Sequence, residues 1–225
     1  MALAELNGLP VIRGHIHMPQ LGAWTADLVV DTETDVTGAV TLTLDGGLRL
    51  VGFAVRGGQF QATEYIRVIG GAGGLVRQAR VQHYRNTTVR AVVSDLVRAA
   101  GESLSNTADS SVLALQLLAW TQLAQPVAAA LTSIASDRRH AGAVAWRVLA
   151  DGTIWIGRET WPDAGLKAPA DYQELVALPS EGWVDLGFEV PRVVPGVSLE
   201  GRRLSFVQHS IDGETVRTKA WVAAG

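Results

Sequence analysis

The chain has 225 residues, which is enough for one large domain or two small ones. Hydrophobic residues make up 48% of it and charged residues 18%, which excludes a disordered chain, because disorder needs low hydrophobicity and high net charge. The absence of cysteine excludes disulfide scaffolds, thiolate metal sites and cysteine nucleophiles, and a formal net charge of −3 excludes the basic footprint of a nucleic-acid-binding protein.

The beginning of the chain and its apolar runs bear on targeting. Met1 to Glu5 contains no basic region followed by an apolar one, so no secretory signal is predicted. No apolar run reaches the roughly 20 residues of a membrane span. We therefore expect no membrane partner, no partner that is a specific nucleic-acid sequence, and no use of the glycosylation sequon Asn86-Thr87-Thr88.

Residues 9–82 alternate between apolar and polar side chains, which is typical of strands with one buried face. The alternation is clearest at 24–30 and 40–44. Glycine-rich stretches, expected to be turns, separate the apolar runs: 46–47, 57–58 and 70–74. Short strands between such turns predict a barrel or a sandwich.

The apolar period changes to that of a helix after Thr88. Apolar residues from Val89 to Ala100 recur at helical spacing, Thr88 is a suitable N-cap, and Gly101 suits the left-handed residue that ends a helix. A second helix is predicted over Pro126–Ala135, with the proline in its first turn. Between them, Val112–Trp120 is almost wholly apolar, and although periodicity fits a helix or a strand there, we expect a helix.

Strand patterns return after Ala143. Asp151-Gly152 and Asp212-Gly213 each lie between apolar runs, and such pairs favour tight hairpins because the turn needs positive φ. Residues 160–181 contain three prolines and little periodicity, so we expect a long loop. The fold class predicted is α+β, mainly β.

Two patterns could bind a cofactor or a metal. The glycines at 70–74 follow a strand, but the spacing is not that of a dinucleotide loop and no helix follows at once, so a β-turn is favoured. His15 and His17 would share one face of a strand, but nothing places His83, His140 or His209 near them to complete a metal site. We predict no cofactor-binding and no metal-binding residues.

Catalytic and sugar-binding candidates are weak as well. No serine-hydrolase elbow and no zinc-protease motif is present. A pair of carboxylates in or near the long loop could hydrolyse a glycoside, and the candidates are Glu159, Asp163, Glu174 and Glu181. The seven tryptophans could stack on sugars, although packing in the core or in interfaces is favoured: Trp24, Trp120, Trp146, Trp155, Trp161, Trp183 and Trp221. We predict no catalytic residues.

The order of these elements resembles the baseplate hub proteins of contractile phage tails, of the late-control-D type, and the related N-terminal part of the type VI secretion spike protein. The segments that carry the resemblance are Leu50–Val55, the capped helix Thr88–Gly101, Trp120 before an Ala-rich helix, the hairpin Trp146–Gly157, Val194-Pro195-Gly196, Gly201–Leu204 with Val207 and His209, and Arg217-Thr218. The resemblance covers most of residues 48–222 and carries over no catalytic residues.

The resemblance implies two β-barrel-like domains joined by a helical portion. On this division the first domain is 1–85, the helical connector 86–140 and the second domain 141–225. It further implies a homotrimer whose six barrels form a pseudo-hexameric ring between the tail tube and the central spike.

The resulting hypothesis is a non-enzymatic structural subunit of a tail baseplate hub. Its expected partners are its own copies, the spike protein, the tube protein and baseplate wedge proteins, with no cofactor. Its expected location is the virion tail, after assembly in the host cytoplasm. The alternatives are a tail-associated carbohydrate-binding β module that uses exposed tryptophans, and a small glycosidase that acts on the cell wall through Glu159 or Glu174.

Overall fold

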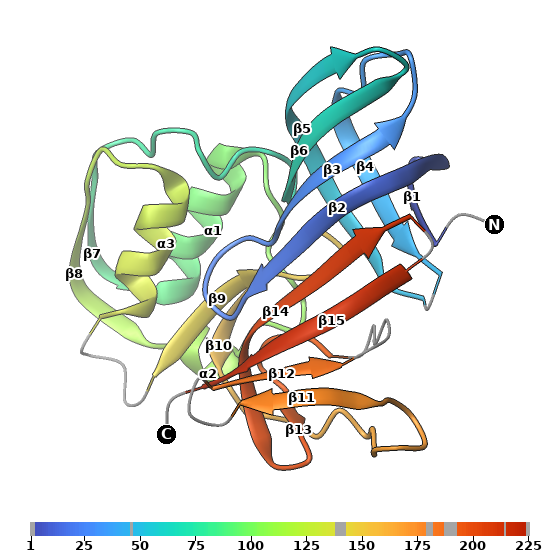
Figure 1. Cartoon of the computed structure of the whole chain (residues 1–225). Coiled ribbons are helices and arrows are strands. Elements are labelled where there is room, and N and C mark those ends of the chain that lie inside the picture. The colour runs from blue at the N-terminus through green and yellow to red at the C-terminus, as the bar shows by residue number, and fades with distance from the viewer. Residues whose placement is uncertain are drawn as a thin grey trace.

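A computed structural model gives the fold (Figure 1). It describes residues 3–45, 47–137, 143–178, 182–186, 193–213 and 215–223, and only the backbone at 175–178. The molecule is mainly β, as the sequence predicts.

Six strands from the first third of the chain close into a barrel. They are β1 (Ala4–Leu6), β2 (Leu9–Pro19), β3 (Thr25–Asp31), β4 (Gly38–Leu44), β5 (Arg49–Phe60) and β6 (Thr63–Gly70). Their order is β1-β4-β5-β6-β3-β2, and β1 pairs with β2 to close the ring. The alternation of apolar residues follows from this closure, because every second side chain points into the barrel, as Leu42, Leu50 and Ile66 do.

The predicted turn at Gly57-Gly58 is wrong. Both glycines lie inside β5 and pair with Ile66 and Tyr65 of β6, so the hairpin turn comes later, after Phe60. The pairing with β6 overrides the local preference of a glycine pair for a turn, as tertiary contacts often do in strands.

The sheet continues beyond the barrel with strands from the end of the chain. They are β11 (Glu174–Leu178), β12 (Trp183–Leu186), β13 (Ser198–Leu199), β14 (Arg202–Asp212) and β15 (Thr215–Val222). β14 pairs with β2 over seven positions, and β15, β12 and β11 follow in that order, while β13 pairs with β14 on its own. The hairpin at Asp212-Gly213 is confirmed. The loop predicted over 160–181 is correct only to residue 173, because β11 follows, and Pro179 to Glu181 lie outside the described residues.

The middle of the chain forms a separate, partly helical layer. It contains β7 (Gln82–Thr88), α1 (Val89–Ala100), α2 (Ser110–Leu113), β8 (Gln116–Gln122), α3 (Val127–Ala135), β9 (Val144–Val148) and β10 (Ile154–Arg158). In α1 the Thr88 hydroxyl accepts from the Ala91 N–H, and Gly101 is left-handed with φ 78°, so both predicted caps are confirmed. Helix α3 and the β9–β10 hairpin are confirmed as well.

The helix expected over Val112–Trp120 is wrong for most of its length. Helix α2 ends at Leu113, and β8 begins at Gln116 and pairs antiparallel with β7. Leu117 is buried, but its neighbour Leu118 is 80% exposed. Because apolar side chains lie on both faces of β8, its sequence shows no clear alternation between apolar and polar residues. The pairing with β7, rather than the local sequence, therefore determines its conformation.

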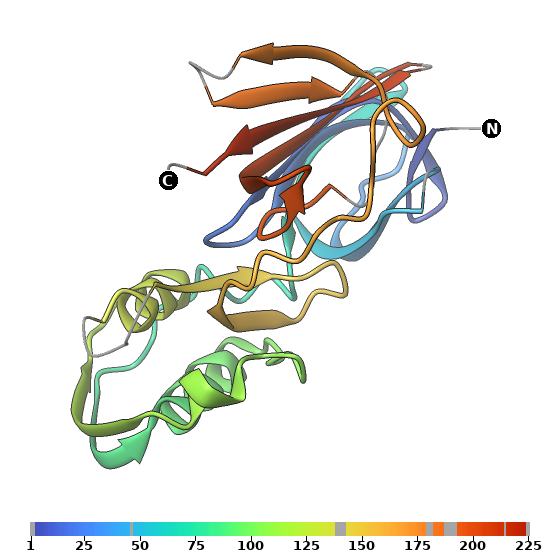
Figure 2. The same ribbon diagram turned by 90° about the horizontal axis from the view of Figure 1, so that it is seen from below.

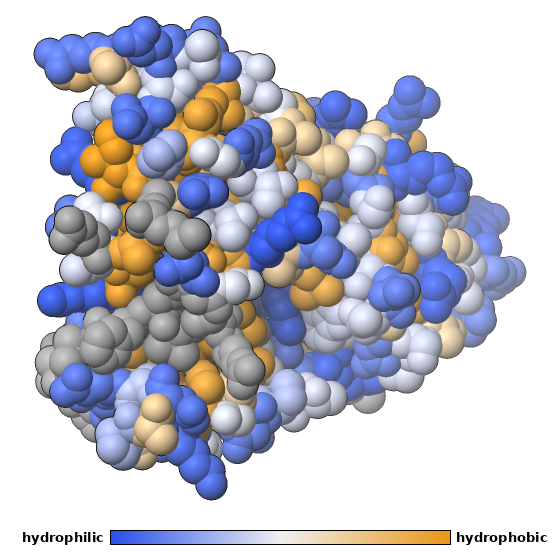
Figure 3. Space-filling view, turned by 90° about the vertical axis from the view of Figure 1, so that its right-hand side faces the viewer, coloured by the Kyte–Doolittle hydropathy of each residue, from blue (hydrophilic) through white to orange (hydrophobic). Residues whose placement is uncertain are grey.

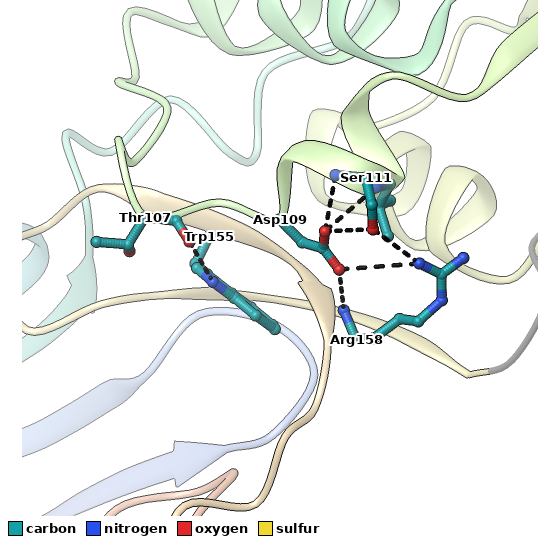
Figure 4. A network of polar contacts seen from close by, with 6 residues as sticks. Thr107, Asp109, Ser111, Trp155 and Arg158 are labelled. Atoms are coloured by element: carbon teal, nitrogen blue, oxygen red, sulfur yellow. Dashed lines mark hydrogen bonds and ion pairs between the residues drawn. The ribbon is translucent and has the colours of Figure 1, made fainter.

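The β9–β10 hairpin lies between the helices and the large sheet (Figure 2). A cluster of polar contacts around Asp109, the N-cap of α2, joins strand β10 of this hairpin to the start of α2 (Figure 4). Asp109 accepts from the Ser111 hydroxyl at 2.6 Å and from the Arg158 N–H at 3.3 Å, and Trp155 donates to the Thr107 carbonyl at 3.1 Å. The hydrogen bond from the Ser111 hydroxyl lowers the pKa of Asp109, and backbone N–H donors lower it further, whereas partial burial opposes this shift.

Trp24 fills the end of the barrel and requires two glycines beside it. Its side chain is fully buried, and a Cβ at Gly70 would lie 2.5 Å from its Nε1, while one at Gly52 would lie 2.7 Å from its Cη2. Neither glycine is needed for a positive φ. At Gly70 the close approach of the ring excludes a side chain, and at Gly52 the ring does so together with the Ile69 carbonyl oxygen, 2.5 Å from the added Cβ.

We therefore expect Gly70→Ala to lower the free energy of unfolding by about 2 kcal/mol or more, because the added methyl group overpacks a buried ring. Urea unfolding measures the change. Gly58→Ala, which also changes a strand glycine but meets nothing within 4 Å, is the matched control. Equal losses from the two substitutions would contradict the packing explanation.

His209 is a fully buried titratable group in β14. Its Nδ1 lies 3.0 Å from the Thr218 hydroxyl, and its Nε2 is buried with no hydrogen-bond partner among the described residues. Burial lowers the pKa of His209 to about 4, so the folded state holds the neutral ring.

This burial makes stability depend on pH in a defined window. The unfolded chain protonates His209 near its ordinary pKa of 6.5, whereas the folded chain does so only near 4, so the free energy of unfolding falls as the pH drops from 6.5 to 4, by up to about 3 kcal/mol. Urea unfolding at several pH values should show a flatter dependence for His209→Gln. His83→Gln, at an exposed histidine, should leave the wild-type slope unchanged; a wild-type slope in His209→Gln would refute the assignment.

Candidate interaction surfaces

The glycine-rich segment at 70–74 is a turn that holds a carboxylate of its own chain. Glu102, which follows α1, accepts from the Ala72 N–H at 2.8 Å and from the Gly74 N–H at 2.7 Å. Gly71 has φ 91°, and a Cβ there would lie 2.6 Å from the Glu102 carboxylate. The backbone donors that would face a pyrophosphate in a dinucleotide loop are thus occupied, and no helix follows, so the turn interpretation is confirmed.

His15 and His17 share the outer face of β2, as predicted, with ring centroids 6.2 Å apart. Partial burial, followed by the neighbouring His15, lowers the pKa of His17. His15 lies 3.1 Å from the Ser210 hydroxyl. Among the described residues, no three histidine, aspartate or glutamate side chains are grouped to hold a metal ion. His83 bonds to Thr121 on the β7–β8 ribbon, His209 is buried, and His140 lies outside the described residues.

Three of the four candidate catalytic carboxylates lie in the described part of the chain, and each of these three has a structural partner. Glu159 forms an ion pair with Arg147, and Glu174 lies 2.7 Å from a guanidinium nitrogen of Arg202. Asp163 accepts from the Gly165 N–H at 2.9 Å and so closes a turn. Glu181 lies outside the described residues.

The tryptophans are placed as packing groups. Trp24 and Trp146 are buried, and Trp120 packs against the core. The other four rings each have a cation near one face: Arg147 lies 4.4 Å from the centroid of Trp155, Arg203 5.4 Å from Trp161, and Lys219 3.5 Å from Trp183 and 5.7 Å from Trp221. A sugar that stacked on those faces would have to displace the cation, which favours the packing interpretation.

A cleft of about 560 Å³ lies where the barrel, the β9–β10 hairpin and residues 194–197 meet. Arg147, Trp155 and Glu159 line it, and they are the residues that already contact one another through the ion pair and the cation–π contact. These three side chains are therefore engaged in contacts within the hairpin and the residue that follows it.

Exposed apolar side chains occur along the β7–β8 ribbon and just before it. The β7–β8 ribbon and the segment before it carry them, with exposed fractions of 80% for Leu118, 67% for Val76, 61% for Val81 and 59% for Leu123. Val81 and Leu123 flank the pair Gln82–Gln122, so they lie next to each other at the open end of the ribbon. Apolar residues also reach the surface between hydrophilic ones on the side that Figure 3 shows. Exposed apolar patches of this kind are typical of protein interfaces.

A groove of about 1130 Å³ crosses the outer face of the sheet. It runs over β15, β14, β2, β3, β6 and β5, which lie side by side in Figure 1. Cross-strand register places six of its residues in one row, in the order Arg217, Ser210, His15, Asp27, Arg67 and Arg56. With Arg13 beside this row, the groove is lined by four arginines and two aspartates, Asp27 and Asp212. It is therefore basic, although the chain has a net charge of −3.

Two β-bulges bring arginines into this groove. The register shifts between Val11 and Arg13 in β2, and between Ala54 and Arg56 in β5. Val11 and Ala54 are buried, but Arg13 and Arg56, two positions later, are exposed, whereas regular alternation would place them on the buried face. The intervening apolar residues, Ile12 and Val55, lie on the same outer side and are 40% and 42% exposed. No local sequence pattern gives these arginines a binding role, because each strand alone contains only one or two of them.

No described helix is long and apolar enough to cross a membrane. No family model matches the sequence, and no curated protein matches it.

Solved structures share the fold over almost the whole chain. The 43 kDa tail protein of prophage MuSo2 from Shewanella oneidensis has a TM-score of 0.68 at 13% identity, over 98% of this chain and 96% of that one. The E. coli c3393 protein, a type VI secretion component described as similar to the T4 tail proteins gp27 and gp5, has a TM-score of 0.66 at 12% identity, over 98% and 77%. The tail protein from Neisseria meningitidis MC58 has 0.62 at 13%, over 98% and 95%. These TM-scores show a common fold, and at identities this low the likeness shows the fold alone.

The Glu102 contacts lead to a stability prediction. Glu102→Ala removes the acceptor of two N–H groups, of which that of Gly74 is buried and that of Ala72 partly buried, so we expect the free energy of unfolding to fall by about 2 kcal/mol. Glu102→Gln keeps one carbonyl oxygen as acceptor and should cost less, and Glu33→Ala, at an exposed loop position, should cost almost nothing. Urea unfolding ranks the three variants, and a Glu102→Ala protein as stable as the wild type would contradict the anchoring role.

Proposed function

We propose that the protein is a structural subunit of a phage or phage-like tail and, within the tail, of the baseplate hub that joins the tube to the central spike. The observation that carries the proposal is the fold: the barrel, the continuing sheet and the helical layer together match tail proteins over 98% of the chain. The earlier resemblance in the order of elements supports the same conclusion independently of the structure.

The proposed assembly is a homotrimer that forms a pseudo-hexameric ring, with the tube protein, the spike protein and baseplate wedge proteins as partners. The exposed apolar residues of the β7–β8 ribbon support an interface, and each strand of that ribbon has one edge that pairs with no other described strand. Free edges and apolar patches are the features that a neighbouring subunit covers. A repeated head-to-tail contact of this kind closes into a ring if the rotation permits.

The subunit is proposed to be non-catalytic and to act in the virion tail, after assembly in the host cytoplasm. The ion pairs of Glu159 and Glu174 support a structural role for those carboxylates. The carbohydrate-binding alternative loses support, because cations lie over the partly exposed tryptophan rings.

The division into domains 1–85, 86–140 and 141–225 stays a prediction. The pairing of β2 with β14 places strands from both outer segments in one sheet, and the β9–β10 hairpin packs against α3 and α2 of the middle segment. If the chain contains two barrel-like units, they are therefore joined through one continuous sheet and do not separate at residues 85 and 140.

The first measurement is the native mass in solution by light scattering on a sizing column, alone and with the cognate spike protein. We expect a trimer, with three times the chain mass of 23.9 kDa, and a ring with an open lumen in electron micrographs. A protein that remains monomeric both at tens of micromolar and in the presence of the spike would refute the hub assignment.

A further inference from the structure

The basic groove has two arginines without a partner in the described part of the chain. Arg67 lies 3.3 Å from Asp27, and Arg13 donates to the Tyr65 hydroxyl at 3.0 Å. Arg56 and Arg217, at the two ends of the cross-strand row, form no ion pair or hydrogen bond among the described residues, and both are exposed. The groove therefore presents two available guanidinium groups, one at each end of the row, with the Arg67–Asp27 ion pair between them.

The same chain carries an exposed acidic loop of complementary charge. This acidic loop, residues 31–35, consists of the last residue of β3 and the start of the connection to β4. It carries Asp31, Glu33 and Asp35, all exposed and without an ion pair among the described residues. The chain has no lysine or arginine between positions 28 and 48, so nothing local neutralises these carboxylates.

The acidic loop is held in shape before any partner arrives. Val36, directly after Asp35, is buried, and its N–H donates to the carboxylate of the buried Glu64 at 2.8 Å. The Thr32 hydroxyl accepts from the Thr34 N–H at 3.1 Å, which fixes the turn between the acidic side chains. A preorganised loop loses less conformational entropy on docking than a disordered one.

We propose that this groove receives the acidic loop 31–35 of a second copy of the chain, so that Arg56 and Arg217 pair with its carboxylates in the assembled ring. The proposal rests on the proposed function, since it names a contact between neighbours in that ring. A second copy is the occupant that the chain itself supplies, because both complementary surfaces are exposed on every copy.

The placement of the two surfaces supports a contact between copies. The groove residues of β3 are Asp27 to Val29, on the face of the sheet, whereas the acidic loop begins at Asp31, where β3 ends beside the β5–β6 turn. Because the two surfaces differ, their contact is head-to-tail and leaves one loop and one groove for the next copy.

The test is a charge swap that is read out by native mass against protein concentration. Arg56→Glu with Arg217→Glu should raise the midpoint concentration of assembly by about tenfold or more, and so should Glu33→Arg with Asp35→Arg. All four substitutions in one chain restore opposite charges at the contact and should bring the midpoint back toward the wild-type value. In the wild type, raising the salt from 50 to 500 mM should weaken assembly, because exposed charge pairs are screened.

The controls separate this contact from general charge effects. Arg49→Glu with Arg90→Glu makes the same charge change at exposed arginines outside the groove and should leave the midpoint unchanged. Circular dichroism of every variant verifies the fold.

The outcomes distinguish the inference from the proposed function. A wild-type protein that never assembles overturns both. Normal assembly of the groove variant overturns the inference alone. Loss of assembly in both double variants, without rescue in the fourfold variant, also overturns the inference. A groove variant that assembles normally but loses binding to the spike protein overturns it as well, since the occupant of the groove is then the spike protein.

Discussion

The pairing of β2 with β14 is the constraint on which the rest of the molecule depends. One edge of β2 serves two neighbours: Leu9 and Pro10 pair with β1 and close the barrel, and Arg13–Pro19 pair with β14. This division is possible because β1 has only three residues and leaves most of an eleven-residue strand uncovered. A longer β1 would occupy the edge that β14 uses and would separate the C-terminal strands from the barrel.

This pairing also creates the surface that the barrel alone lacks. Without it, Arg217 and Ser210 would not lie in one row with His15, and the groove would have only one side. Its register determines more than position, because a slip by one residue would exchange the two faces of β14 and move the buried His209 to the outside. The buried ring and the exposed groove are therefore two consequences of one register.

How much the sequence predicts depends on the range of the signal. The caps of α1 at Thr88 and Gly101 and the tight turns at Asp151 and Asp212 are encoded within a few residues, and the structure confirms them. The strand β8 was missed because its conformation depends on β7, which is about thirty residues away along the chain. The continuous sheet was missed because β2 and β14 are almost two hundred residues apart and no local pattern records their pairing.

The candidate surfaces show the same limit more sharply. Arg13 and Arg56 look like ordinary strand residues, and strict alternation would place both of them inside the barrel. Only the bulges at Ile12 and Val55 turn them outward, and a bulge has no reliable signature in one sequence.

The two bulges place Arg13 and Arg56 on the same outer side as Ile12 and Val55, which are 40% and 42% exposed. A surface that combines guanidinium groups with exposed apolar side chains is consistent with a protein contact. On the proposed assembly, the apolar ribbon supplies buried area, and the groove supplies the charge complementarity that fixes which copy meets which surface and in what orientation.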